Sequence, residues 1–127
     1  MRVTVDELAT AVNKELVAYS GEVLNALDAS TFEVAEDTRD EIKETARERF
    51  KGRKYWRSWT VTKQNRKGGV TRIVHAKAPY YRLTHLLENG HAKVNGGYVA
   101  GRPHIAPAAD KAEEKLVKDL TERITAL

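Results

Sequence analysis

The sequence of 127 residues predicts an α+β fold in a single domain spanning residues 1–127. Apolar residues keep helical spacing through the first third of the chain, two segments rich in β-branched and aromatic residues flank a turn, and a second helical pattern closes the chain. We therefore expect a long N-terminal helix, an antiparallel β-hairpin with room for a short third edge strand, a short middle helix, and a C-terminal amphipathic helix packed on the sheet.

The first helix is expected to run from Val5 to Phe50, with Thr4 and Glu7 spaced as a capping box at its start. An unbroken helix of this length would extend about 65 to 70 Å, whereas a compact domain of this size has a radius of gyration of only about 14 Å. We therefore expect either a bend near Asp28 or a helix that projects and packs on another subunit, and we favour the bend. The helical phase is set by Val5, Leu8, Val12, Leu16, Tyr19, Val23, Leu27, Ala35, Thr38, Ile42, Ala46 and Phe50.

The segment after this helix predicts two antiparallel strands. Residues around Trp59–Thr62 and Val70–Val74 favour extended backbone, and Asn65–Gly69 has the composition of a turn. If the first strand starts near Tyr55, then Tyr55, Arg57, Trp59 and Val61 share one of its faces. Ile105, which lies between two prolines, could add the third edge strand.

The remaining elements follow from glycine and proline positions. Leu83, Leu86 and Leu87 recur at helical spacing in a short helix from Tyr80 to Asn89, which Gly90 is placed to end. A mobile loop is expected over 93–102, followed by the last helix from Ala108 to Ala126. The apolar stripe of that helix is Ala109, Ala112, Leu116, Leu120, Ile124 and Leu127.

The order of these pieces resembles a known family. The residues that carry the resemblance are His85-Leu86-Leu87-Glu88-Asn89-Gly90-His91-Ala92, a glycine-containing loop, and Arg102-Pro103-His104-Ile105-Ala106-Pro107-Ala108 before an amphipathic helix, with a weaker echo in Tyr55–Val61. They resemble the small head-tail joining or tail-completion proteins of long-tailed double-stranded DNA phages. The segment Phe50–Lys54 departs from the family pattern, which shows a proline and a threonine-glycine pair there.

The resemblance implies a structural protein of the virion without a catalytic residue. It implies an oligomeric ring, a hexamer, that completes the tail and joins it to the DNA-filled head. The implied partners are further copies of the chain, a head-completion or connector protein, the tail tube protein, and DNA passing through the lumen. The implied location is the head-tail junction of the virion, reached after assembly in the host cytoplasm.

The charges are divided into blocks. Residues 1–46 contain 4 basic and 11 acidic residues, a balance of −7, whereas residues 47–77 contain 11 basic residues and one acid, a balance of +10. A chain divided in this way can meet its own copies acidic flank to basic flank. The candidates for a subunit or DNA interface are Arg53, Lys54, Arg57, Lys63, Arg66, Lys67, Arg72, Asn95, Gly96, Gly97, Tyr98 and Arg102.

The main alternative is a small nucleic-acid-binding protein that uses the basic and aromatic hairpin of residues 47–77. Tyr55, Trp56 and Trp59 are interleaved with arginines and lysines, which is the composition of a surface that follows phosphates and stacks on bases. A basic ribonuclease-like toxin would also suit the pI of about 9.4, but RNA would repel the acidic first helix. A purely structural interpretation is that the tryptophans fill the hydrophobic core and do not stack on bases.

Other chemistry finds little support in the sequence. His85, Glu88, His91 and His104 could gather around a metal, but His91 follows the glycine stop and His104 follows the loop. A triad of Ser58, His75 and Asp110 lacks a nucleophile elbow. There are no cysteines, no apolar run long enough for a membrane span, and no signal-peptide pattern, so we expect a soluble cytoplasmic product. We assign no metal and no cofactor.

Overall fold

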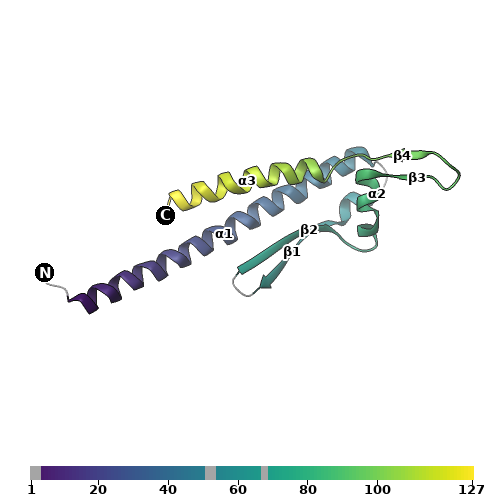
Figure 1. The fold of residues 1–127 in the computed structure, drawn as a ribbon. Coiled ribbons are helices and arrows are strands. Elements are labelled where there is room, and N and C mark those ends of the chain that lie inside the picture. Colours follow the sequence, from purple (N-terminus) through teal and green to yellow (C-terminus); the bar gives the residue numbers. More distant parts are fainter. Residues whose placement is uncertain (1–3, 51–53, 67–68) are drawn as a thin grey trace.

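The computed structural model describes the backbone of residues 4–50, 54–66 and 69–127, and the side chains of these residues except those of 66, 69 and 70. The elements confirm the α+β class (Figure 1). In chain order they are helix α1 (Val5–Arg49), the 3₁₀ turn η1 (Tyr55–Ser58), strands β1 (Trp59–Arg66) and β2 (Gly69–Ala76), the 3₁₀ turn η2 (Tyr80–Leu83), helix α2 (Thr84–Asn89), strands β3 (Gly90–Ala92) and β4 (Tyr98–Ala100), and helix α3 (Ala106–Thr125).

Helix α1 is continuous, so the expected bend near Asp28 is wrong. The capping box at its start is confirmed: the Thr4 side chain accepts a hydrogen bond from the Glu7 N–H at 3.2 Å, and the Thr4 N–H donates to the Glu7 carboxylate at 3.0 Å. Tertiary packing explains the missing bend, because Ser30 is buried within the weak interval and Asp28 pairs with Arg72 of β2 at 2.6 Å. Packing of this kind overrides the low helix propensity of the interval.

Helix α3 packs along α1 in the antiparallel direction. The Lys111 ammonium lies 2.6 Å from the Glu41 carboxylate, and Arg123, further along α3, lies 2.5 Å from Glu33, nearer the start of α1. The expected packing of this helix on the sheet holds only at its first turn, where Ala108 is buried with Trp59 and Ala76. Along the rest of α3 the neighbour is α1, which lies between α3 and the β1–β2 hairpin in Figure 1.

The main hairpin pairs β1 with β2 from Trp59 opposite Ala76 to Arg66 opposite Gly69. Its first strand starts at Trp59 and not near Tyr55, so the expected shared face of Tyr55, Arg57, Trp59 and Val61 is wrong. Residues 55–58 form the η1 turn instead, in which the Ser58 hydroxyl donates to the Tyr55 carbonyl at 2.5 Å. Burial of the Tyr55 side chain fixes this turn and sets the direction in which β1 leaves it.

The third edge strand expected at Ile105 is also wrong, because Ile105 is the N-cap residue of α3. A second small sheet forms elsewhere: β3 pairs with β4, with Gly90 opposite Ala100. The expected mobile loop over 93–102 therefore contains a paired strand. Gly90 ends α2 with a φ of 88°, as predicted, and a side chain there would collide with the Val99 carbonyl oxygen.

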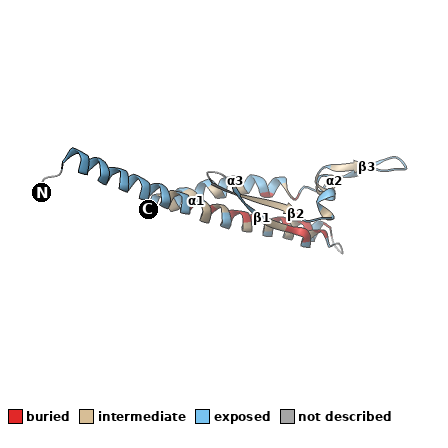
Figure 2. Ribbon diagram, turned by 90° about the horizontal axis from the view of Figure 1, so that it is seen from below, coloured by how far each residue is buried: buried red, intermediate tan, exposed pale blue. Residues whose placement is uncertain are grey.

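The core lies at one end of the molecule. It forms where the C-terminal part of α1 meets η1, the base of the hairpin and the first turn of α3. Figure 2 shows the buried residues gathered along this part of α1, while the N-terminal part of the helix is exposed. The buried cluster comprises Ile42, Ala46, Phe50, Tyr55, Trp59, Ala76 and Ala108.

Candidate interaction surfaces

The N-terminal part of α1 carries an apolar stripe that no described residue covers. We call residues 5–23 the helix tip. Every residue of α1 from Val5 to Glu22 is exposed, and the stripe is in phase with positions further along α1, such as Ala26 and Ser30, that are buried. Since Arg123, near the end of α3, pairs with Glu33, the covering helix ends before it reaches the tip. The exposed fractions in the stripe are Val5 83%, Leu8 57%, Val12 50%, Leu16 60% and Tyr19 51%.

An open apolar groove lies at the opposite end of the molecule. We call it the hairpin groove; it has a volume of about 620 Å³ and is lined by Trp59, Val74, Ala76, Ala78, Tyr81 and Ile105, with His75, Lys77 and Thr84 beside them. Trp59 is buried in its floor, whereas Lys77 and Ala78 are exposed at its edge. The groove thus combines an apolar floor with a cation at its rim.

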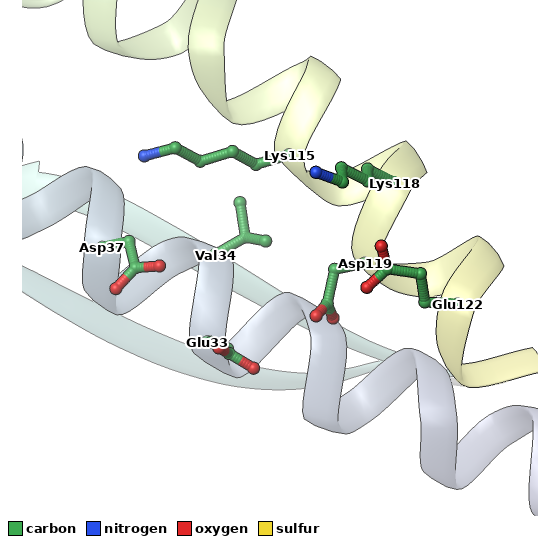
Figure 3. A pocket seen from close by; sticks show the side chains of 7 residues that line it. All are labelled: Glu33, Val34, Asp37, Lys115, Lys118, Asp119 and Glu122. Atoms are coloured by element: carbon green, nitrogen blue, oxygen red, sulfur yellow. The ribbon is translucent and has the colours of Figure 1, made fainter. Parts of the chain in front are cut away.

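A smaller pocket of about 180 Å³ lies on the seam between α1 and α3 (Figure 3). Val34 points from α1 toward α3, and Asp119 points from α3 toward α1. The other residues that line the pocket carry charges of both signs: Glu33, Asp37, Lys115, Lys118 and Glu122. These side chains belong to the helix seam, where Arg123 also pairs with Glu33 and Asp119. We therefore interpret this pocket as a feature of helix packing.

A buried polar network joins η1, α2 and the start of α3. The Tyr55 hydroxyl lies 2.7 Å from His104 Nε2, while His104 Nδ1 lies 2.9 Å from the Arg102 carbonyl and 3.1 Å from the Glu88 carboxylate. Both neighbours of Nδ1 accept hydrogen bonds, so Nδ1 carries the hydrogen, and in the neutral ring Nε2 accepts from Tyr55. The His104 ring is packed edge-to-face against Phe50, Tyr55 and Trp59.

Glu88 caps the N-terminus of α3. Its carboxylate accepts hydrogen bonds from the backbone N–H groups of His104, Ile105 and Ala106 at 2.7 to 2.9 Å. Burial opposes ionisation of this carboxyl group, but the three backbone hydrogen bonds outweigh burial and hold the pKa of Glu88 below its usual value. Burial also raises the pKa of Tyr55 to about 12. At neutral pH the Glu88 carboxylate is therefore charged, and the Tyr55 hydroxyl keeps its hydrogen.

The network accounts for two of the four candidate metal ligands. Glu88 and His104 meet, but His85 is exposed on α2 and His91 lies in β3. Within residues 4–50, 54–66 and 69–127, no three His, Cys, Asp or Glu side chains gather where they could hold a metal ion. Two members of the Ser58, His75 and Asp110 triad contact other groups. The Ser58 hydroxyl donates to the Tyr55 carbonyl, and His75 contacts the Thr62 hydroxyl at 2.6 Å.

Two of the basic interface candidates are tied to α1. The Arg72 guanidinium pairs with Asp28 and lies over the Phe32 ring, and the Arg102 guanidinium donates to the Arg49 carbonyl at 2.6 Å. Lys54, Arg57 and Lys63 are exposed. Arg53 and Lys67 lie outside the described residues; Arg66 ends β1, but its side chain is likewise outside the description.

The aromatic residues of the basic segment are mostly in the core. Tyr55 is fully buried and Trp59 is 4% exposed, so neither offers a face to a base. Trp56 is half-buried, with the guanidinium groups of Arg47 and Arg57 over its ring at 5.3 and 5.1 Å. The stacking surface expected for nucleic acid is therefore reduced to one tryptophan whose ring already contacts two arginines.

The remaining candidates form the β3–β4 turn and its flank. The Lys93 N–H donates to the Gly97 carbonyl at 3.0 Å, and Gly96 and Gly97 adopt φ values of 93° and 86°. Asn95 is exposed in this turn, and the exposed Tyr98 donates its hydroxyl to the Asn89 carbonyl at 2.7 Å. The turn projects away from the core (Figure 1).

Sequence reasoning missed the hairpin groove and the capping role of Glu88. The groove joins residues from 59 to 105, and no local pattern reveals such long-range neighbours. Glu88 gave no local signal either, because it lies 16 to 18 residues before the backbone N–H groups of α3 that it caps, and β3 and β4 lie between them. Over the part of the chain that the structure describes, no helix combines the length and the apolar character that a membrane crossing requires.

Comparison with known families identifies the chain. The model of a family described as "HK97-gp10_like: Bacteriophage HK97-gp10, putative tail-component" matches residues 10–90, which is more than half of the sequence. The comparisons with curated proteins and with solved structures gave no match. The matched region contains most of α1, the β1–β2 hairpin and α2, which together shape the two apolar surfaces. The chain therefore belongs to the HK97-gp10-like family of bacteriophage tail components.

Proposed function

We propose that this tail component forms a ring of six copies that completes the phage tail and joins it to the head. The observation that carries the proposal is the helix tip, whose apolar stripe is exposed in the single chain. An exposed stripe of this kind marks a surface for another protein. The work of such a ring is positional, so the proposal includes no catalytic residue and no cofactor.

The division of charge supports assembly from unlike surfaces. An acidic segment of −7 at one end and a basic segment of +10 after it allow one copy to meet the next head to tail. Contacts between unlike surfaces close into a ring when the rotation between copies closes. The resemblance in His85–Ala92 and Arg102–Ala108 adds the expected partners: a head-completion or connector protein, the tail tube protein, and DNA in the lumen.

The site and location follow from the same proposal. We infer that residues 1–127 act as one tail-completion-like domain, which assembles in the host cytoplasm and ends at the head-tail junction of the virion. The interface candidates of the β3–β4 turn and the exposed cations Lys54, Arg57 and Lys63 would then face neighbouring proteins or DNA. Arg72 and Arg102, which contact α1, would instead support the fold of each copy.

Self-association tests the ring. Native mass spectrometry over a range of protein and salt concentrations should show oligomers that increase with protein concentration and decrease with salt, because screening weakens contacts between opposite charges. Six copies should be the largest closed species. A protein that remains monomeric at high concentration and low salt would contradict the proposal.

Direct nucleic-acid binding remains the second candidate, supported by the exposure of Lys54, Arg57 and Lys63. If it is the main function, replacing Lys54 and Lys63 with glutamate should weaken binding to duplex DNA. The slope of the logarithm of the affinity against the logarithm of the salt concentration should become shallower by about one for each lost phosphate contact. Fluorescence anisotropy at low salt measures both effects. Absence of binding at low salt would eliminate this candidate.

A further inference from the structure

We propose that the helix tip of one copy docks into the hairpin groove of the next copy. This inference rests on the proposed assembly of the tail component and specifies the surfaces that meet. It assigns the exposed stripe of α1 as the inserted element and the groove around Trp59 and Tyr81 as its receptor. The occupant of the groove is thus a second copy of the same chain.

A single chain cannot make this contact with itself. The groove residues Trp59 and Ala76 pack with Ala46 near the end of α1, whereas the helix tip ends at Val23. The uninterrupted helix between Val23 and Ala46 holds the two surfaces about 35 Å apart, at 1.5 Å per residue. The described structure contains no hinge between them, because α1 is helical throughout that interval. Only another molecule can bring a tip to the groove.

The chemistry of the two surfaces is complementary. The stripe places Val5, Leu8 and Val12 at positions i, i+3 and i+7, the spacing with which an amphipathic helix enters an apolar groove. Residues 5–25 contain four acidic residues and one lysine, a balance of −3, while the groove has Lys77 at its rim and the exposed Arg82 nearby in η2. Apolar side chains would thus meet the floor, and acidic flanks would meet basic rims.

The stripe also continues an interface that already exists. Helix α3 covers the same face of α1 from the middle of the helix onward, and the tip is the extension of that face beyond the end of α3. Pairing two tips directly is the obvious competitor for this surface. That arrangement would place two segments of −3 charge side by side, which costs free energy through repulsion. A groove with a basic rim avoids this cost.

Cysteine cross-linking tests the contact, because the chain contains no cysteine of its own. Val12→Cys marks the tip, and Ala78→Cys marks the exposed edge of the groove. When the two variants are mixed under mild oxidation, we expect a disulfide-linked dimer containing one chain of each kind. The matched control mixes Val12→Cys with Val117→Cys, which places an exposed cysteine on the outer face of α3. The dimer of Val12→Cys with Ala78→Cys should form about tenfold faster than the control dimer, because docking raises the effective concentration of the thiols.

The double variant Leu8→Glu, Val12→Glu provides the second measurement, with Val117→Glu as its control. All three positions are exposed in the single chain, so circular dichroism at a dilution where every protein is monomeric should show the same helix content. We expect the double variant to lose oligomers in native mass spectrometry while the control keeps them. Loss of assembly only in the tip variant, together with the mixed disulfide, supports docking into the groove.

Two results would overturn the docking while leaving the ring proposal intact. One is that oligomers persist in the Leu8→Glu, Val12→Glu variant and that the mixture of Val12→Cys and Ala78→Cys chains forms no disulfide between the two kinds of chain. The other is a disulfide between two Val12→Cys chains in preference to the mixed product, which would assign the tips to each other. If the unmodified protein forms no oligomer at any concentration, the ring proposal fails as well, and the two failures are thereby distinguished.

Discussion

His104 shows how one side chain connects three parts of this fold. Its ring nitrogens contact the Tyr55 hydroxyl of η1 on one side and the Arg102 carbonyl and Glu88 carboxylate on the other. It is 1% exposed, so each of these polar contacts replaces hydration that folding removes. The histidine that the sequence offered as a metal ligand is therefore used to join α2 and α3 to the core.

Removing the Tyr55 hydroxyl should destabilise the protein. In Tyr55→Phe, the Nε2 atom of His104 loses its hydrogen-bond donor inside the core, and we expect the free energy of unfolding to fall by about 1 to 3 kcal/mol. Urea denaturation followed by circular dichroism measures the change. Tyr98→Phe is the matched control, because its hydroxyl bond to the Asn89 carbonyl is solvent-exposed. Equal losses in the two variants would contradict this account of the network.

Glu88 should make stability depend on pH in the acidic range. Because its folded-state pKa lies below its usual value, its contribution is fully present above the unfolded pKa of about 4.3 and is lost as pH falls through the folded value. In Glu88→Gln, this part of the acid-induced loss should disappear, and the protein should be less stable at neutral pH. Denaturation at several pH values measures both effects. The exposed Glu113→Gln on α3 should keep the pH dependence of the unmodified protein.

At the scale of elements, Arg72 attaches the hairpin to α1. Its side chain is 9% exposed and pairs with Asp28 while lying over Phe32. Arg72→Ala should leave the hairpin less firmly attached, so amide hydrogen exchange in β1 and β2 should accelerate. Lys63→Ala is the matched control, since Lys63 is directly opposite Arg72 in the register but exposed. Similar exchange in both variants would contradict the role of the ion pair.

Several elements could be predicted because their signals are local. The capping box of Thr4 and Glu7, the helix stop at Gly90 and the antiparallel hairpin each depend on residues within a few positions of one another. The bend at Asp28 failed because Arg72 and α3, distant in sequence, hold that interval helical. The strand at Ile105 failed because Glu88 fixes the backbone there as a helix start.

The interaction surfaces were predictable only in part. The helical spacing of apolar residues in the sequence predicted the stripe of α1. Its exposure depends on where α3 ends along α1, which only the tertiary structure shows. Trp59 was considered both as a stacking residue and as a core residue, and its burial supports the second interpretation. The hairpin groove could not be predicted, since its lining residues come from β1, β2, η2 and the start of α3.

At the scale of the whole molecule, the core occupies one end and the helix tip extends from it. A helix segment of about twenty residues without tertiary packing is marginally stable in water. In dilute protein, we therefore expect the backbone amides of residues 5–23 to exchange much faster than those of residues 30–46. With increasing concentration, the tip amides should become protected as copies assemble. Hydrogen exchange followed by mass spectrometry measures both, and slow exchange of the tip in the monomer would contradict the picture.

The unbroken α1 also acts as a ruler, because a helix fixes both distance and angle along its axis. Inserting one residue between Asn25 and Ala26 would turn the tip by about 100° relative to the core, whereas inserting seven would nearly restore the angle and lengthen the reach by about 10 Å. In an assembly whose copies meet through this helix, the number of helical turns between the tip and the core sets the spacing between subunits. If the tip docks as proposed, a wider ring with the same number of copies would require a longer first helix, and not merely a different set of contact residues.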